Sequence, residues 1–569
     1  MGLGARVTYG LLAVVAAAVA LVYLSRILLA DPVYAGAESA HMIRALYGKV
    51  LAAHPLVLPQ LRELDDTVFS LIVRGLSYAT SDLLPWLRTL GAAAYLAGLA
   101  LVFLSMGKTE RARAVPILLA AFAYPYYRFA AAALPEGWYV GVLGLTIFAT
   151  ARLYMPHPIL HAALAGALSA VLVLLAPQGV AVCAAFAILA MFDLALGRRD
   201  IRLFLGRLVI FVAALAVGIN LLQMIAGQPV APPLSTYLGA RYETLLADGQ
   251  ASWLIGVRTL VAMIFAAIML AGAPILTGML RVEMRWRWLR ERGRFVLAPQ
   301  EAAFLLTVLT LAGTLIATAI LATAPQSDPS RIWGRQFEAL LPMLWLAAAP
   351  FIGEFERGAG RWWRVAMGVA PVVGLAGLTA CLLDGVTPNP WDAAALGAFA
   401  PTEPYVFAAA GATMLAAGAA CTFTAWPLSR IWLAAFIALA VMSTALDLPW
   451  QRDAAAGRAR LLSELSSADK IIARRPGGVA VVASDPVEAR LAYWRLRARP
   501  DAVMATPDPI ALSGVETVVL MNGNGPGPGW SPILKGRELT VFGRQKQPRI
   551  GPRASVTGGG GLGSGPGSS

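Results

Sequence analysis

The feature that most constrains this chain is a long series of apolar stretches, each about the length of a membrane span. A helix needs ~20 mostly apolar residues to cross the hydrocarbon core of a bilayer. Thirteen stretches meet that requirement approximately: 8–29, 84–106, 113–131, 137–154, 158–176, 179–197, 205–226, 253–280, 301–323, 337–353, 365–384, 405–425 and 429–448. The pattern predicts a mainly α, polytopic transmembrane protein, because only helices and closed barrels satisfy their backbone polar groups within lipid.

Composition supports this class and excludes others. Charged residues make up 14% of the chain, against ~25% in soluble domains, and mean hydropathy is +0.67. The formal net charge of +14 could suggest nucleic acid, but Arg and Lys crowd the cytoplasmic loops of polytopic proteins, so no nucleic-acid partner is expected. The cysteines, Cys183, Cys381 and Cys421, all fall in apolar spans and have no metal-ligand or disulfide spacing.

The placement of Arg and Lys also predicts orientation. Cations cluster around 108–113, 198–207, 281–294 and 357–364, whereas loops 30–83, 227–252, 324–336 and 385–404 are sparse in them. The first set is therefore predicted to be cytoplasmic. Stretch 8–29 has no clear cleavage site after it and is interpreted as a retained span, so the N-terminus lies inside. An odd number of spans then places the C-terminal region outside.

The composition changes near residue 450. Residues 478–484, 515–521 and 538–543 are predicted strands, and 486–497 a helix that Asp485 caps, with Pro486 in its first turn. We therefore expect a transmembrane module over 1–450, a small α/β domain outside the membrane over 451–550, and a disordered Gly/Ser tail over 551–569.

Polar side chains gather in the first outer loop, residues 30–83, which is unusually long. It carries Asp31 at the exit of the first span, then Tyr34, Glu38, His41 and His54. Helical spacing predicts an amphipathic helix over 36–48 that lies at the membrane interface, and a second interfacial segment over 60–80. The simplest alternative is that these polar groups only face water.

Several short motifs resemble the GT-C superfamily of membrane glycosyltransferases. They are Glu38-Ser-Ala-His41-Met-Ile-Arg, His54-Pro55-Leu-Val-Leu, the acidic turn Pro135-Glu136-Gly, and Arg331-Ile-Trp-Gly-Arg335-Gln-Phe-Glu338. The layout over 1–450 is similar too: one span, a long acidic outer loop, then many spans and an outer C-terminal domain. Within this superfamily, the chain is similar to the bacterial aminoarabinose, mannosyl and arabinosyl transferases.

The resemblance implies an inverting glycosyltransferase of the bacterial inner membrane, acting on the periplasmic side. It would move a sugar from a polyprenyl-phosphate donor to a lipid, glycan or protein acceptor. It would use a carboxylate as base, with Glu38, Asp31 and Glu136 as candidates, and arginines for the donor phosphate, with Arg331, Arg335 and Arg128 as candidates. His54, His41, Tyr34 and Glu338 are candidate substrate or metal ligands, and a divalent metal such as Mg or Mn is possible.

The resemblance has one departure and leaves alternatives open. Ala37 stands where the family carries a carboxylate before Glu38, so either Asp31 or Glu38 must serve, and a noncatalytic role stays open. Each arginine could instead be an interfacial anchor. Loop 227–252 could be a lid or an ordinary connector. An O-antigen polymerase or ligase-like enzyme and a lipid or glycan transporter are the other function classes, although no internal repeat indicates a transporter.

Overall fold

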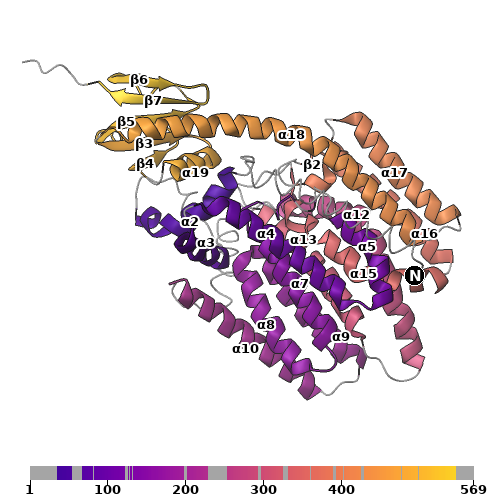
Figure 1. The fold of residues 1–569 in the computed structure, drawn as a ribbon. Helices are drawn as coiled ribbons and strands as arrows, with labels where there is room; N and C mark the ends of the chain where they lie inside the picture. Colours follow the sequence, from indigo (N-terminus) through magenta and orange to yellow (C-terminus); the bar gives the residue numbers. More distant parts are fainter. Residues whose placement is uncertain are drawn as a thin grey trace, which may run out of the picture. The chain divides into compact units, whose positions relative to one another are not determined.

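The structure of the protein is a computed structural model (Figure 1), which describes most of the chain. The described residues are 35–53, 67–80, 82–121, 126, 128–130, 132–197, 201–227, 253–291, 297–323, 331–358, 361–388, 393–400, 403–424, 428–475, 477–496, 499–523 and 525–545. The predicted span 8–29, nearly all of the predicted lid 227–252 and the tail 551–569 lie outside them.

The described part is dominated by helices. The first outer loop contains α2 (Ala35–Ala53) and α3 (Thr67–Ala79). The following helices are α4 (Leu83–Ser105), α5 (Lys108–Ala121), α7 (Glu136–Leu153), α8 (Pro158–Leu175), α9 (Val180–Gly197), α10 (Ile201–Ile225), α12 (Trp253–Glu291), α13 (Pro299–Ala322), α14 (Arg335–Glu338), α15 (Leu341–Gly358), α16 (Arg361–Leu383), α17 (Pro404–Phe423) and α18 (Leu428–Ile472). Short 3-10 helices are η2 (Pro177–Gly179) and η4 (Ala394–Phe399), and β1 (Arg331–Ile332) pairs in parallel with β2 (Thr387–Pro388).

Membrane-spanning character is confirmed, although the number of spans stays a prediction. Among the described residues, seven helices are long and apolar enough to cross a bilayer: α4, α8, α10, α12 up to Trp288, α13, α16 and α17. Shorter apolar helices cover Thr67–Ala79, Pro177–Phe192 and Arg430–Leu446. Over the predicted span 113–131, the structure describes α5 up to Ala121, helical Tyr126 and a turn at residues 128–130, and the residues between them lie outside the described part of the chain, so this span stays a prediction.

Helices α4 and α7 lie side by side along much of their length (Figure 1). Glycines make this close approach possible. A Cβ on Gly144 would lie 2.4 Å from the Gly98 carbonyl oxygen, and a Cβ on Gly137 would lie 2.4 Å from that of Gly91. Small residues of this kind allow membrane helices to pack backbone against backbone. The pair matters for the site because α7 begins at Glu136.

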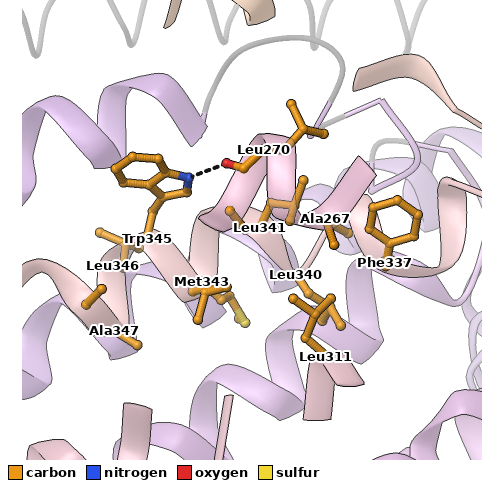
Figure 2. Packing of buried hydrophobic residues seen from close by; sticks show 14 of the residues in the cluster. Ala267, Leu270, Leu311, Phe337, Leu340, Leu341, Met343, Trp345, Leu346 and Ala347 are labelled. Carbon is orange, nitrogen blue, oxygen red and sulfur yellow. Dashed lines mark hydrogen bonds between the residues drawn. The ribbon is translucent and has the colours of Figure 1, made fainter. Parts of the chain in front are cut away.

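The core of the helical unit is centred on α15, which is buried over most of its first half. Figure 2 shows Trp345 of this helix, whose indole N–H donates to the Leu270 carbonyl of α12 at 3.2 Å. Leu311 of α13 belongs to the same cluster. A helix that is apolar on all sides is stable only where neighbouring helices or lipid surround it. This core fixes the position of α15, which directly follows α14 in the chain.

The C-terminal region forms a separate compact unit. The division falls within α18, between Arg460 and Leu461. Its strands are β3 (Gly478–Ala483), β4 (Ala502–Met504), β5 (Val515–Met521), β6 (Trp530–Lys535) and β7 (Leu539–Arg544), in the sheet order β4-β3-β5-β7-β6. The first three of that order run parallel, and β7 is antiparallel to both of its neighbours.

The single described helix of this unit's α/β portion is α19 (Pro486–Arg495), between β3 and β4. It begins as the sequence predicts, because the Asp485 carboxylate accepts a hydrogen bond from the Val487 N–H at 2.8 Å. Strands β4 and β6 were not expected. The first, Ala-Val-Met, is apolar and largely buried but only three residues long, too short to stand out in the sequence. The second contains Pro532, and half of its side chains are exposed, so it lacks the apolar pattern of a buried strand.

Candidate functional site

The first outer loop contributes a buried carboxylate to the helical unit. Glu38 of α2 is 1% exposed and Arg88 of α4 is 7% exposed. The Arg88 guanidinium donates through Nε to Glu38 Oε1 at 2.8 Å and through Nη2 to Oε2 at 2.6 Å. The Ala133 N–H adds a third hydrogen bond to Oε1 at 2.8 Å. The alternative that Glu38 only faces water is therefore wrong: its charge is compensated by a bidentate ion pair and a backbone donor.

The sequence of α4 explains how an arginine comes to lie there. Buried residues of α4 recur at three- and four-residue spacing, from Arg88 through Gly91, Ala92 and Tyr95 to Leu99. The helical period therefore places Arg88 on the face that packs into the protein. A buried charge of this kind requires a paired partner, since removing one member of a buried ion pair costs about 3–5 kcal/mol.

A second ion pair joins the acidic turn to the later outer segment. Arg335, the first residue of α14, donates through Nε and Nη2 to Oε1 of Glu136, the first residue of α7. Glu136 is 7% exposed, and its Oε2 has no hydrogen-bond partner in the described part of the chain. The Arg335 side chain is 21% exposed. The site thus contains a buried carboxylate oxygen with acceptor capacity left.

A third buried carboxylate belongs to Glu338, at the other end of the short helix α14 from Arg335. Glu338 is fully buried, and its Oε2 accepts from the Ala395 N–H of η4 at 3.0 Å. Gly334 is packed tightly here, because a Cβ on it would lie 2.5 Å from Glu338 Oε1 and 2.7 Å from the Ala393 Cα. The contact joins α14 to η4, so Glu338 serves the local packing of two outer segments.

The candidate arginines are held by aromatic rings. The Arg128 Cζ lies 4.7 Å from the centroid of the Phe129 ring, and the Arg335 Cζ lies 5.7 Å from the same centroid. Arg331 stacks on Trp333, with its Cζ 3.8 Å from the ring centroid. Guanidinium groups within ~6 Å of a ring centroid are attracted to the negative face of the ring. Arg128 is almost completely buried, so Arg335 is the more accessible of the two cations at Phe129.

These contacts bring together segments that are distant in sequence. Helix α2 meets the start of α4 and the turn before α7 through Glu38. The start of α7 meets α14 through Glu136, although the two residues of that pair are 199 positions apart. Phe129 and Leu134 also share an apolar cluster with Ala394 of η4. The distribution of Arg and Lys predicts that all these helix ends and turns lie on the same, outer side of the membrane.

The remaining predicted residues are placed differently. Asp31, Tyr34 and His54 lie outside the described residues. His41 is half-buried in α2, and its ring lies edge-on to Phe69 of α3 with the centroids 5.3 Å apart. That contact packs the two outer-loop helices against each other.

The contacts of the described carboxylates leave few oxygens open to a divalent metal, and such a metal stays a prediction because Asp31, Tyr34 and His54 lie outside the described residues. Both Glu38 oxygens are engaged by Arg88, and Glu136 Oε1 is engaged by Arg335, whereas Mg²⁺ and Mn²⁺ prefer several open oxygen ligands. Within the ranges that the structure describes, no group of three His, Cys, Asp or Glu side chains could hold a metal ion.

Two residues of the site were missed in the sequence. Arg88 lies inside a predicted span, and an ionisable residue within a span is itself a signal of a buried partner. Phe129 carries no such signal, because an aromatic residue in an apolar stretch is ordinary. Its role follows only from the two guanidinium groups beside it.

Comparison with solved structures identifies the fold. The chain is similar to ArnT from Cupriavidus metallidurans bound to undecaprenyl phosphate, with a TM-score of 0.51, 14% identity, and coverage of 93% of this chain and 97% of that one. The chain has the GT-C fold. The apo state of the same ArnT matches at a TM-score of 0.49 and 15% identity, with the same coverage. No known family model matches the sequence, and no curated protein matches it significantly. This fold confirms the fold expected from the motifs, although the two sequences are only 14% identical.

Proposed function

We propose that this protein is an inverting membrane glycosyltransferase that moves a sugar from a polyprenyl-phosphate donor to a lipid, glycan or protein acceptor. The observation that carries the proposal is the Glu136–Arg335 pair, a carboxylate and a partly exposed arginine brought together within a GT-C fold. The ArnT structure of similar fold holds undecaprenyl phosphate, which supports a lipid-phosphate donor. The cation pattern of the loops supports a periplasmic location for the reaction, at the bacterial inner membrane.

The proposed reaction needs two groups that this site supplies. An acceptor hydroxyl or amine attacks the anomeric carbon, the bond from that carbon to the phosphate oxygen breaks, and the bonding electrons leave with the phosphate. The proton of the acceptor passes to a carboxylate, and the growing charge of the phosphate is met by a guanidinium. Charge-assisted bidentate hydrogen bonds make arginine well suited to that phosphate.

Among the described carboxylates, Glu136 is the candidate base that the contacts favour. Its Oε2 has no partner in the described residues and can accept a proton, whereas both Glu38 oxygens already accept hydrogen bonds. Glu38 is then a positioning residue that anchors α2 to the turn preceding Glu136. Asp31, which stands in the same outer loop, is the competing candidate from the family resemblance.

Arg335 is the proposed phosphate ligand. A guanidinium has five N–H groups, and its two bonds to Glu136 use Nε and Nη2. Because its side chain is also 21% exposed, Arg335 is proposed to contact the leaving phosphate beside Glu136. Arg128 and Arg331 would add positive potential nearby, each stacked on its own aromatic neighbour.

The test uses the purified full-length protein in proteoliposomes with radiolabelled polyprenyl-phosphate sugars and a panel of acceptors. Glu136→Gln should lower the turnover number by ~10²-fold or more, because general-base catalysis contributes about that much. The thermal midpoint of the variant is measured beside its activity, which separates loss of the base from loss of the Arg335 ion pair. Asp31→Asn is measured beside it. Full activity of Glu136→Gln together with loss of activity in Asp31→Asn would show that Asp31, and not Glu136, is the base. If the wild-type protein transfers no sugar from any polyprenyl-phosphate donor, the proposed function is wrong.

A further inference from the structure

The further inference concerns Phe129, the residue whose ring lies beside both Arg128 and Arg335. The two Cζ atoms are 4.7 Å and 5.7 Å from the ring centroid. We infer that Phe129 is a positioning residue, whose ring holds the two guanidinium groups in the orientation that receives an anionic lipid phosphate. This inference rests on the proposed function, since it names what prepares that site for its donor.

The physical argument begins with the flexibility of arginine. An arginine side chain carries about 2 kcal/mol of rotamer entropy, and ordering such a side chain during binding weakens the affinity for the ligand. A side chain that is already held in place avoids that loss. Glu136 fixes one edge of the Arg335 guanidinium, and the Phe129 ring lies against the group as well, so two independent contacts restrict its rotation.

The position of Phe129 in the fold suits this role. Phe129 is buried among small and aliphatic side chains, Ala132, Leu134 and Ala394, which join the turn before α7 to η4. The ring is therefore fixed by the protein and does not follow the arginines. Burial also strengthens the attraction between a guanidinium and an aromatic face, from ~0.5–1 kcal/mol at exposed sites to ~2 kcal/mol or more when water is excluded.

An ordinary core phenylalanine would contribute only its shape and apolar surface. The two roles separate when the charge distribution of the ring is changed and its size is kept nearly constant. Stepwise fluorination does this, because each fluorine withdraws electron density from the face of the ring. A role in packing predicts little dependence on fluorine number, whereas a cation–π role predicts a graded one.

The experiment places mono-, di- and trifluorophenylalanine at position 129 of the full-length protein by amber suppression. The probe is undecaprenyl phosphate alone in detergent micelles, and the measurements are its Kd and the thermal midpoint of each variant. We expect the Kd to rise with fluorine number, by roughly tenfold at three fluorines, which corresponds to the ordering cost of about one arginine side chain. The thermal midpoint should change little. Phe129→Leu, which removes the ring, should weaken binding at least as much.

The matched control is the same fluorinated series at Phe304 of α13, a fully buried residue whose ring meets Phe351 edge-on with centroids 5.7 Å apart. Fluorination there should leave the Kd unchanged. A flat Kd series at Phe129, with wild-type binding intact, would overturn the inference and leave the proposed function standing. A graded series at both positions would also overturn it, because the effect would then be general. Failure of the wild-type protein to bind undecaprenyl phosphate would contradict the proposed function, and the inference would fall with it.

Discussion

At the residue scale, the chemistry of this site depends on how each carboxylate is neutralised. Glu38 has a dedicated arginine and a backbone donor, whereas Glu136 shares one oxygen with Arg335 and keeps the other without a described partner. Two glutamates of one protein are thereby given different tasks by their contacts. In the proposed function, the first is a structural anchor and the second is the candidate base.

The anchor can be tested by a double-mutant cycle on Glu38→Gln and Arg88→Met. Each single change should destabilise the protein by about 3–5 kcal/mol, because it leaves the other charged partner buried and uncompensated. The double variant should be less destabilised than the sum of the two single variants, since neither charge is then left alone. Glutamine keeps an oxygen that can still accept from the Ala133 N–H. Thermal unfolding in detergent measures all three, and strictly additive losses would contradict a coupled pair.

At the element scale, the contact between α4 and α7 positions the two ends that carry Arg88 and Glu136. Gly98 and Gly144 bring the backbones into direct contact midway along the pair. Since helices are stiff over this length, a displacement of α7 in the middle is transmitted to Glu136 at its first residue. The glycines therefore affect the site without touching it.

The corresponding prediction concerns Gly144→Ala. Its new methyl group would lie 2.4 Å from the Gly98 carbonyl oxygen, so the helices must separate, at a cost of about 1–3 kcal/mol typical of overpacking. We expect a lower thermal midpoint and a lower rate of sugar transfer.

The matched control is Gly206→Ala in α10, where no atom lies within 4 Å of the added Cβ. That substitution should be neutral or stabilise the helix by up to ~1 kcal/mol, because alanine has the higher helix propensity. If the two variants unfold at the same temperature, close packing of α4 on α7 is not important for stability.

At the scale of the whole molecule, orientation depends on the number of spans. Thirteen spans with a cytoplasmic N-terminus place the C-terminal unit outside. A fusion of alkaline phosphatase after Arg544 should then be active, because this enzyme matures only outside the cytoplasm, and a fluorescent-protein fusion at the same point should be dark.

The control fusion follows Gly197, in a loop whose arginines predict a cytoplasmic location. There the two reporters should give the opposite result. Phosphatase activity at both junctions, or at neither, would show that the predicted topology is wrong.

Local features of the molecule could be predicted from the sequence, and its long-range pairs could not. Most spans follow from runs of apolar residues, and the start of α19 follows from Asp485 and Pro486, which act within one turn. The motifs pointed to Glu136 and Arg335 but not to their contact, because 199 positions separate them. Phe129 was missed for the same reason, because it acquires its role from partners that only the packed helices bring near. For Arg88, the charge inside a predicted span signals a buried partner, but the sequence does not identify that partner as Glu38.

The Glu38–Arg88 pair also constrains how the protein is made. Glu38 reaches its buried position only with Arg88, 50 positions later, and the Ala133 N–H, 95 positions later. Before both have been synthesised and inserted, docking α2 would bury an uncompensated carboxylate. The loop helix is therefore expected to wait at the membrane surface during translation, and to dock only when the ribosome has already completed α4 and the turn that follows α5.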